Sequence, residues 1–252
     1  MFFKAVVNIV RFLVWIVNGK TEIQNKEYIP KDTVFILAAP HRSLLDPVFI
    51  SFGVYPHIFS SMAKQELFKG KFITWVLTHM NAFPVNRENP GPSALKQPVS
   101  ILKEGKTNLL IFPTGSRHST EIKGGTSSIA KLANVPILPV VYQGPLTFKD
   151  LILKRKKATV RFGKPIYLPK EKRISREELA AYDELLGTYF PSVGSGNRSE
   201  LCVCSEINQL MFDVKYAAAF KKNSTGKFPV LFFGIAADSF GQSFIDWSMY
   251  MS

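Results

Sequence analysis

Short apolar runs alternate with helical patterns between residues 33 and 166, and this alternation most restricts how the chain can fold. We interpret the short runs as buried strands and the longer periodic stretches as helices. The strands are expected at residues 33–39, 57–62, 82–85, 108–112, 136–142 and 159–162, and the helices from about Pro47 and at 65–80, 93–104 and 124–132. Strands that alternate with helices predict an α/β layered domain, in which helices flank a sheet.

An apolar segment precedes this domain. Residues 2–17 are almost all apolar, except for Lys4, Asn8 and Arg11, and Asn18 follows. On a helix these four polar residues fall within one narrow arc. The pattern predicts an amphipathic helix that lies in the plane of a membrane interface. Packing of the helix on its own domain is one alternative, and a transmembrane span is another, although the segment lies at the lower limit of length.

The chain divides by composition into three parts. We expect a membrane-associating helix over residues 1–20, a folded domain over 21–186, and a tail over 187–252 to which no role is assigned. Residues 191–197 have the composition of a flexible linker. The only two cysteines lie in the tail, too few for a disulfide framework, which fits a reducing cytoplasmic setting.

The formal net charge of +13 leaves three classes of partner open: nucleic acid, an anionic membrane face and anionic small molecules. No recognition motif accompanies the charge, so we predict no nucleic-acid partner. Residues 154–157 form the basic run Lys-Arg-Lys-Lys. This run indicates either contact with anionic headgroups or a solvated loop before a strand.

His41 and Asp46 are the candidate acid–base pair. Transfer of a group to an alcohol needs a base that takes the hydroxyl proton, and histidine is the usual choice. A carboxylate can fix the imidazole tautomer and stabilise the imidazolium. A regular helix would separate two residues five positions apart, whereas a turn between strand and helix can bring them together. The alternative is that Asp46 caps the following helix and that His41 is a loop histidine.

Two further segments suit a phosphate group. Arg87 follows the expected strand 82–85, and its guanidinium is a good fork for phosphate oxygens. Gly115 follows the strand 108–112 and allows close approach of the backbone to a ligand, and Ser116 and Arg117 come next. Taken singly, each segment also fits an ordinary turn or a surface arginine.

Together, the segments 41–46, 83–87, 112–119 and 135–139 resemble, in the same order, the four motif blocks of the lysophospholipid acyltransferase family. The resemblance extends to the bacterial 1-acyl-glycerol-3-phosphate acyltransferases within it. The first block is His-x4-Asp and the fourth is Val-Pro-Ile-x-Pro, and both match here. The similarity covers about residues 1–170, and four ordered blocks make it specific to the family.

The resemblance implies the fold of the family, a mixed α/β sheet flanked by helices. It also implies a general base at His41 oriented by Asp46. The substrate-binding residues that it implies are Arg87, Gly115, Ser116, Arg117 and Pro139. The implied reaction moves a fatty acyl group from coenzyme A or acyl carrier protein to the sn-2 hydroxyl of lysophosphatidate, which makes phosphatidate for phospholipid biosynthesis. The resemblance implies no metal or other cofactor. It also implies a peripheral or monotopic position on the cytoplasmic face of the cell membrane.

Two positions depart from the family pattern, because Thr114 stands where a glutamate is usual and Asn86 stands where an aspartate is common. Both departures remove negative charge near the proposed phosphate site and question any catalytic role of that glutamate. Alternative functions therefore stay open. They are acyl transfer to glycerol 3-phosphate or another lysophospholipid, a non-catalytic peripheral membrane protein of the same fold, and a hydrolase that activates water with the same pair.

Overall fold

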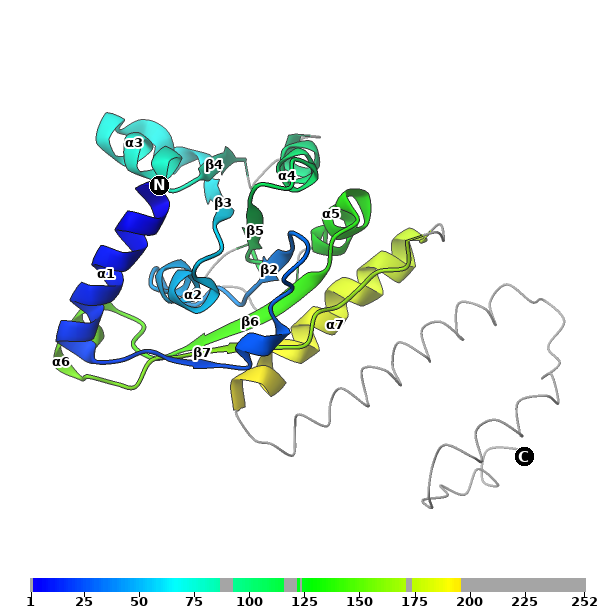
Figure 1. Ribbon diagram of the computed structural model, residues 1–252. Coiled ribbons are helices and arrows are strands. Elements are labelled where there is room, and N and C mark those ends of the chain that lie inside the picture. The colour runs from blue at the N-terminus through cyan, green and yellow to red at the C-terminus, as the bar shows by residue number, and fades with distance from the viewer. Residues whose placement is uncertain (1, 87–92, 116–121, 123, 171–173, 196–252) are drawn as a thin grey trace, which may run out of the picture. The chain divides into compact units, whose positions relative to one another are not determined.

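Seven strands form one mixed sheet in the part of the chain that the computed structural model describes, namely residues 2–86, 93–115, 122, 124–170 and 174–195 (Figure 1). The chain divides into two units, Met1–Phe212 and Asp213–Ser252, and every described residue belongs to the first. The strands are β1 (Glu22–Gln24), β2 (Ile36–Ala38), β3 (Phe59–Lys64), β4 (Ala82–Val85), β5 (Asn108–Ile111), β6 (Ile137–Gln143) and β7 (Thr159–Phe162).

The strands lie in the order β1-β7-β6-β2-β5-β3-β4. All neighbouring pairs are parallel except β6 and β7, in which Val140 lies opposite Phe162. The predicted mixed α/β sheet is therefore confirmed. Because β2, β5, β6, β3 and β4 run in one direction, their carboxyl ends meet at one edge of the sheet, the place where α/β proteins bind ligands.

Helices cover both faces of the sheet (Figure 1). The α-helices are α1 (Phe2–Asn18), α2 (Asp46–Val54), α3 (Lys71–His79), α4 (Ser93–Lys103), α5 (Thr126–Ala133), α6 (Phe148–Leu153) and α7 (Arg176–Ser195), and the 3-10 helices are η1 (Lys26–Tyr28) and η2 (Gln65–Lys69). Helices α1, α2 and α6 contribute to one hydrophobic cluster, and α4, α5 and α7 contribute to the other.

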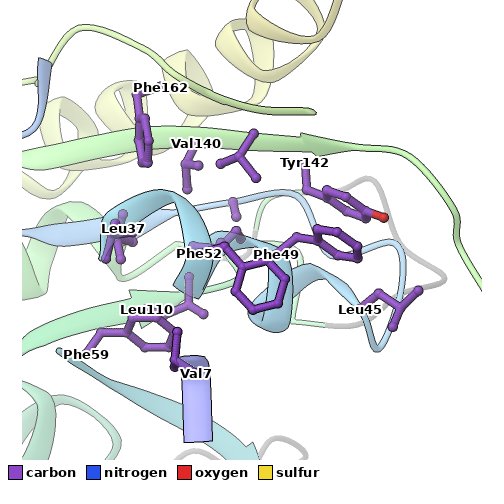
Figure 2. Packing of buried hydrophobic residues seen from close by; sticks show 14 of the residues in the cluster. Val7, Leu37, Leu45, Phe49, Phe52, Phe59, Leu110, Val140, Tyr142 and Phe162 are labelled. Atoms are coloured by element: carbon purple, nitrogen blue, oxygen red, sulfur yellow. The ribbon is translucent and has the colours of Figure 1, made fainter. Parts of the chain in front are cut away.

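Alternate residues of the central strands supply the two clusters, as the period of a β-strand requires. In β2, Leu37 belongs to the cluster under α1 and α2, whereas Ile36 and Ala38 belong to the opposite one. Figure 2 shows the first cluster, with Phe49 and Phe52 of α2 packed among strand residues. Both phenylalanines are fully buried, and burial of such a side chain stabilises a fold by about 1.5–3 kcal/mol.

Helix α1 has two apolar faces. Phe3, Val7 and Val14 are buried in the first cluster, so the helix packs on its own domain, one of the alternatives considered above. The opposite face is also apolar but exposed, and we call it the outer face of α1; it comprises Ile9, Phe12, Leu13, Trp15 and Ile16. None of the described helices has the length and hydrophobicity that a bilayer span requires.

Helix α7 corrects the predicted domain boundary. The helix continues through Ser195, and Tyr189 and Phe190 are buried against the sheet, so the folded unit extends beyond residue 186. The prediction of a flexible linker from residue 191 is wrong for residues 191–195, which are helical. Composition alone misled the prediction, since it does not show whether a segment continues a helix that packs on the sheet. The remainder of the predicted tail, 196–252, lies outside the described residues.

Asp183 of α7 also caps another helix. Its carboxylate accepts hydrogen bonds from the backbone N–H groups of Gly125 (2.8 Å) and Ser127 (2.9 Å) and from the Ser127 hydroxyl (2.9 Å). These are donors at the start of α5 that have no partner within that helix. An anion at a helix amino terminus is also favoured by the helix dipole. Helix α7 is thus joined to α5 through a buried polar contact that no local sequence pattern indicates.

Other differences concern short elements. The expected helix over residues 65–80 is divided into η2 and α3, with Gly70 between them in an extended conformation. Strand β1 and helix α6 were not predicted, since three and six residues are too few to show a period. Asp46 is the first residue of α2 and not its cap.

We predict that Gly163→Ala will destabilise the protein by about 1–3 kcal/mol, as overpacking does. A Cβ at this position would overlap the Tyr189 ring of α7 and would lie 2.9 Å from its hydroxyl. Thermal unfolding followed by circular dichroism measures the change. The control is Gly70→Ala, which meets nothing within 4 Å and is expected to leave the melting temperature nearly unchanged. Equal melting temperatures for both variants would contradict the packing of α7 described above.

Candidate active site

The loop between β2 and α2 carries His41 at the carboxyl edge of the sheet. Strand β2 ends at Ala38 and α2 begins at Asp46, so a tight loop joins two buried elements. The loop brings His41 Nδ1 within 3.0 Å of Asp46 Oδ2. A turn between strand and helix is the local structure that the sequence predicts would join the pair, and in the structure the two side chains meet.

Asp46 organises the loop through one oxygen. Besides His41, its Oδ2 accepts hydrogen bonds from the backbone N–H groups of Arg42 (2.6 Å) and Ser43 (2.7 Å). The carboxylate is therefore turned towards the loop and forms no side-chain bond that caps α2, in contrast to the simple capping alternative. The Asp46 side chain is 2% exposed, whereas that of His41 is 12% exposed. The carboxylate is shielded while the imidazole stays accessible.

The contact decides which imidazole nitrogen is free. An ionised carboxylate can only accept hydrogen bonds, so the neutral ring of His41 carries its proton on Nδ1. Its Nε2 then has a lone pair available to take a proton. This is the tautomer that a general base next to a carboxylate requires.

Phe112 packs against one face of the imidazole. Its ring stacks on that of His41, with the centroids 4.1 Å apart and the planes inclined by 24°. Phe112 directly follows β5, which is the parallel neighbour of β2, and both strands end at the same edge. Phe112 lies in the third motif block, but the sequence indicates no contact between it and His41. Only the strand order, which the sequence does not show, brings them together.

A second set of contacts fastens the loop to the end of β6. The Arg42 guanidinium donates to the carbonyl of Tyr142, and the Ser43 hydroxyl donates to that of Leu146 at 2.7 Å. Burial raises the pKa of the Tyr142 phenol well above its usual value. The phenol therefore stays protonated and donates to the carbonyl of Pro145 at 2.8 Å. Arg42 and Ser43 were not singled out from the sequence, although they lie inside the first motif block.

The turn after β5 has the conformation that its glycine predicts. Gly115 has φ +67°, a region that glycine adopts without strain, and its N–H donates to the carbonyl of Phe112 at 2.9 Å. Thr114, which replaces the family glutamate, is buried. Backbone of this turn can approach a ligand at the sheet edge.

The remaining predicted site residues are only partly located. Arg87, Ser116 and Arg117 lie outside the described residues. Strand β4, which precedes Arg87, ends at the same edge of the sheet as β2 and β5. Pro139 is buried in β6 opposite Ala38 of β2. Whether Pro139 borders the acyl chain stays a prediction.

The fold and the site together define an α/β protein that carries a hydrogen-bonded histidine–aspartate pair at the carboxyl edge of its sheet. A family model described as "Acyltransferase" matches residues 20–143, which contain His41, Asp46 and the turn at Gly115. The 1-acyl-sn-glycerol-3-phosphate acyltransferase of Streptococcus pneumoniae is 41% identical over 191 residues, which are 75% of this chain and 72% of that protein. The enzyme of that name from Bacillus subtilis is 39% identical over 171 residues, 67% of this chain and 85% of that protein.

A solved structure agrees with these relatives. The crystal structure of the 1-acyl-sn-glycerophosphate (LPA) acyltransferase PlsC from Thermotoga maritima superposes with a TM-score of 0.56 at 26% identity. The alignment covers 74% of this chain and 77% of that one. The chain belongs to the acyltransferase family, and the predicted family and class of enzyme are confirmed.

Proposed function

We propose that this protein transfers a fatty acyl group from an acyl thioester to the sn-2 hydroxyl of 1-acyl-glycerol 3-phosphate and so forms phosphatidate. The observation that supports this most directly is the pair of His41 and Asp46, 3.0 Å apart, with Nε2 of the imidazole left as a base. The relatives from Streptococcus pneumoniae and Bacillus subtilis are named for this acceptor, which supports its choice here.

In the proposed reaction His41 Nε2 removes the proton of the acceptor hydroxyl as its oxygen attacks the thioester carbonyl. Asp46 stabilises the imidazolium that forms. The tetrahedral intermediate collapses with cleavage of the C–S bond, and the imidazolium returns its proton to the departing thiolate. One ester and one thiol are formed from one alcohol and one thioester, so the chemistry needs no metal or other cofactor. Coenzyme A and acyl carrier protein are both candidate carriers of the donor.

The test is transfer of labelled acyl groups from acyl-coenzyme A and from acyl carrier protein to lysophosphatidate, with glycerol 3-phosphate as a parallel acceptor. Phosphatidate formed from lysophosphatidate supports the proposal and identifies the donor. If product forms from glycerol 3-phosphate and not from lysophosphatidate, glycerol 3-phosphate is the acceptor instead. Thioester hydrolysis that is equally fast without any acceptor would indicate a hydrolase instead.

We propose that Arg87 and Arg117 bind the phosphate of the acceptor, that Gly115 allows close approach of the backbone, and that Ser116 offers a hydroxyl donor. Arg117→Ala is expected to raise the KM for lysophosphatidate about 10- to 100-fold, since a hydrogen bond to a charged group contributes about 1.5–3 kcal/mol. Initial rates against acceptor concentration measure this effect. Arg176→Ala, a change in the first turn of α7, is the control. An unchanged KM for Arg117→Ala would remove this residue from the phosphate site.

We propose that the outer face of α1 holds the enzyme at the membrane surface on the cytoplasmic side. The support is a helix whose inner face is already packed on the domain while its outer face exposes five large apolar side chains. Phe12→Ser with Ile16→Ser is expected to reduce sedimentation with phospholipid vesicles at least tenfold. Deletion of residues 1–18 is a poorer test, because it would also uncover the core that Phe3, Val7 and Val14 close. Vesicle binding equal to that of wild type would place the anchor elsewhere.

A further inference from the structure

The segment Leu146–Lys157, which contains α6, exposes an unusual number of large apolar side chains, and we call it the α6 surface. Thr147 begins the helix, since its hydroxyl accepts a hydrogen bond from the N–H of Asp150 at 3.1 Å. Leu151 is buried in the first hydrophobic cluster and fixes the helix to the domain. The apolar side chains that stay exposed are Leu146 (47%), Phe148 (60%), Ile152 (57%) and Leu153 (68%). An exposed apolar group of this kind marks an interaction site.

The same segment is strongly basic. Its five basic residues are Lys149, Lys154, Arg155, Lys156 and Lys157. Two carboxylates lie against them: Asp150 pairs with Lys154 at 2.6 Å, and Glu22 pairs with Lys157 at 2.5 Å. The surface therefore keeps a positive excess beside its apolar side chains. This combination fits a layer that offers both phosphate groups and hydrocarbon.

Hydrogen bonds join the α6 surface to the end of α1. Arg155 Nε donates to the carbonyl of Val17 at 3.1 Å, and Asn18 Nδ2 donates to the carbonyl of Lys156 at 3.0 Å. The basic run thus binds the carbonyl end of α1, where the helix dipole favours positive charge. Figure 1 shows α6 beside this end of α1, and the two helices are in contact.

The other end of the segment is joined to the active-site loop. Leu146 accepts the hydrogen bond of the Ser43 hydroxyl, and Leu44, between His41 and Asp46, is 60% exposed. A single hydrogen bond therefore joins the α6 surface directly to the loop that carries His41. If the α6 surface contacts a membrane, the His41 loop lies next to that membrane, where a lipid acceptor would enter the site.

We propose that the α6 surface is a second membrane-docking element, which binds the headgroup region of an anionic phospholipid bilayer and orients the His41 loop towards it. The proposal rests on the proposed function, because it assigns the lipid face of that same site. The exposed Phe148, Ile152 and Leu153 favour a bilayer over a nucleic acid or an acidic carrier protein, whose surfaces would be met by the basic residues alone. The element acts together with the outer face of α1 and gives preference for anionic lipid.

The experiment uses the full-length chain and two double variants. Ile152→Ser with Leu153→Ser removes apolar contact, and Lys149→Gln with Lys156→Gln removes charge while leaving Arg155 on α1. The matched controls alter exposed residues on the opposite face of the sheet: Leu95→Ser with Leu132→Ser, and Lys103→Gln with Lys106→Gln. Sedimentation is measured with vesicles of phosphatidylcholine and with vesicles that also contain phosphatidylglycerol. Acyl transfer is measured both to lysophosphatidate in vesicles and to a short-chain analogue below its critical micelle concentration.

We expect the apolar variant to bind both vesicle types at least tenfold more weakly, and the charge variant to lose roughly tenfold on anionic vesicles only. Both should lose turnover on vesicle substrate and keep it on the dispersed analogue, with the controls unchanged. Vesicle binding by both variants equal to that of the controls would overturn the proposal. So would loss of turnover confined to acyl carrier protein as donor, which would make that protein the partner. A wild type that is inactive on every substrate yet binds anionic vesicles through this surface would refute the proposed function and leave the docking element standing.

Discussion

Replacement of His41 with alanine is expected to lower kcat for acyl transfer about 10²- to 10⁴-fold, the usual contribution of a general base. The geometry gives the reason, since Asp46 occupies Nδ1 and leaves Nε2 as the group that takes the hydroxyl proton. Among the residues that the structure describes, the imidazole hydrogen-bonds only to Asp46 and stacks only on Phe112, so the fold should tolerate its loss. Steady-state rates with saturating donor and acceptor measure the effect.

The control for this substitution is His79→Ala, which removes an exposed histidine at the end of α3. Both variants should bind vesicles and melt as the wild type does, so that a fall in kcat for His41→Ala alone reports chemistry. If His41→Ala kept more than about a tenth of wild-type kcat, the role of His41 as the base would have to be abandoned.

Replacement of Asp46 with asparagine is expected to lower kcat roughly a hundredfold or more while leaving the fold nearly intact. The three hydrogen bonds that the carboxylate forms with described residues converge on Oδ2, so an asparagine oxygen in that position can still accept them. What the substitution removes is the negative charge that stabilises the imidazolium. The affected step is therefore proton transfer, and kcat should fall with little change in the KM for lysophosphatidate.

Asp46→Ala separates charge from structure. It leaves the part-buried N–H of Arg42 and the buried N–H of Ser43 without their acceptor, and an unsatisfied buried group costs about 1–3 kcal/mol. The alanine variant should therefore melt at a lower temperature than the asparagine variant. The kcat values of the two variants should be similar, because both lack the negative charge. Equal melting temperatures would show that the carboxylate does not hold the loop, and wild-type kcat in Asp46→Asn would show that its charge is not needed.

Only those parts of the site that depend on residues close together in the sequence could be predicted. A strand, a short turn and a helix place His41 and Asp46 together almost regardless of the surrounding fold, and the pair was correctly expected. Gly115 was expected at a turn for the same local reason, and its positive φ agrees. The stack of Phe112 on His41 could not be predicted, because it depends on β5 being the neighbour of β2.

The sequence by itself determined where the buried strands lie, and the bounds 82–85 and 159–162 match β4 and β7. It did so because hydrophobic periodicity is a property of adjacent residues. The tertiary structure alone decided the strand order, the antiparallel entry of β7 and the packing of α7 beyond residue 186. It also decided that α1 buries one apolar face and exposes the other. These outcomes depend on which distant surfaces meet, and burial against a partner far along the chain leaves no local pattern.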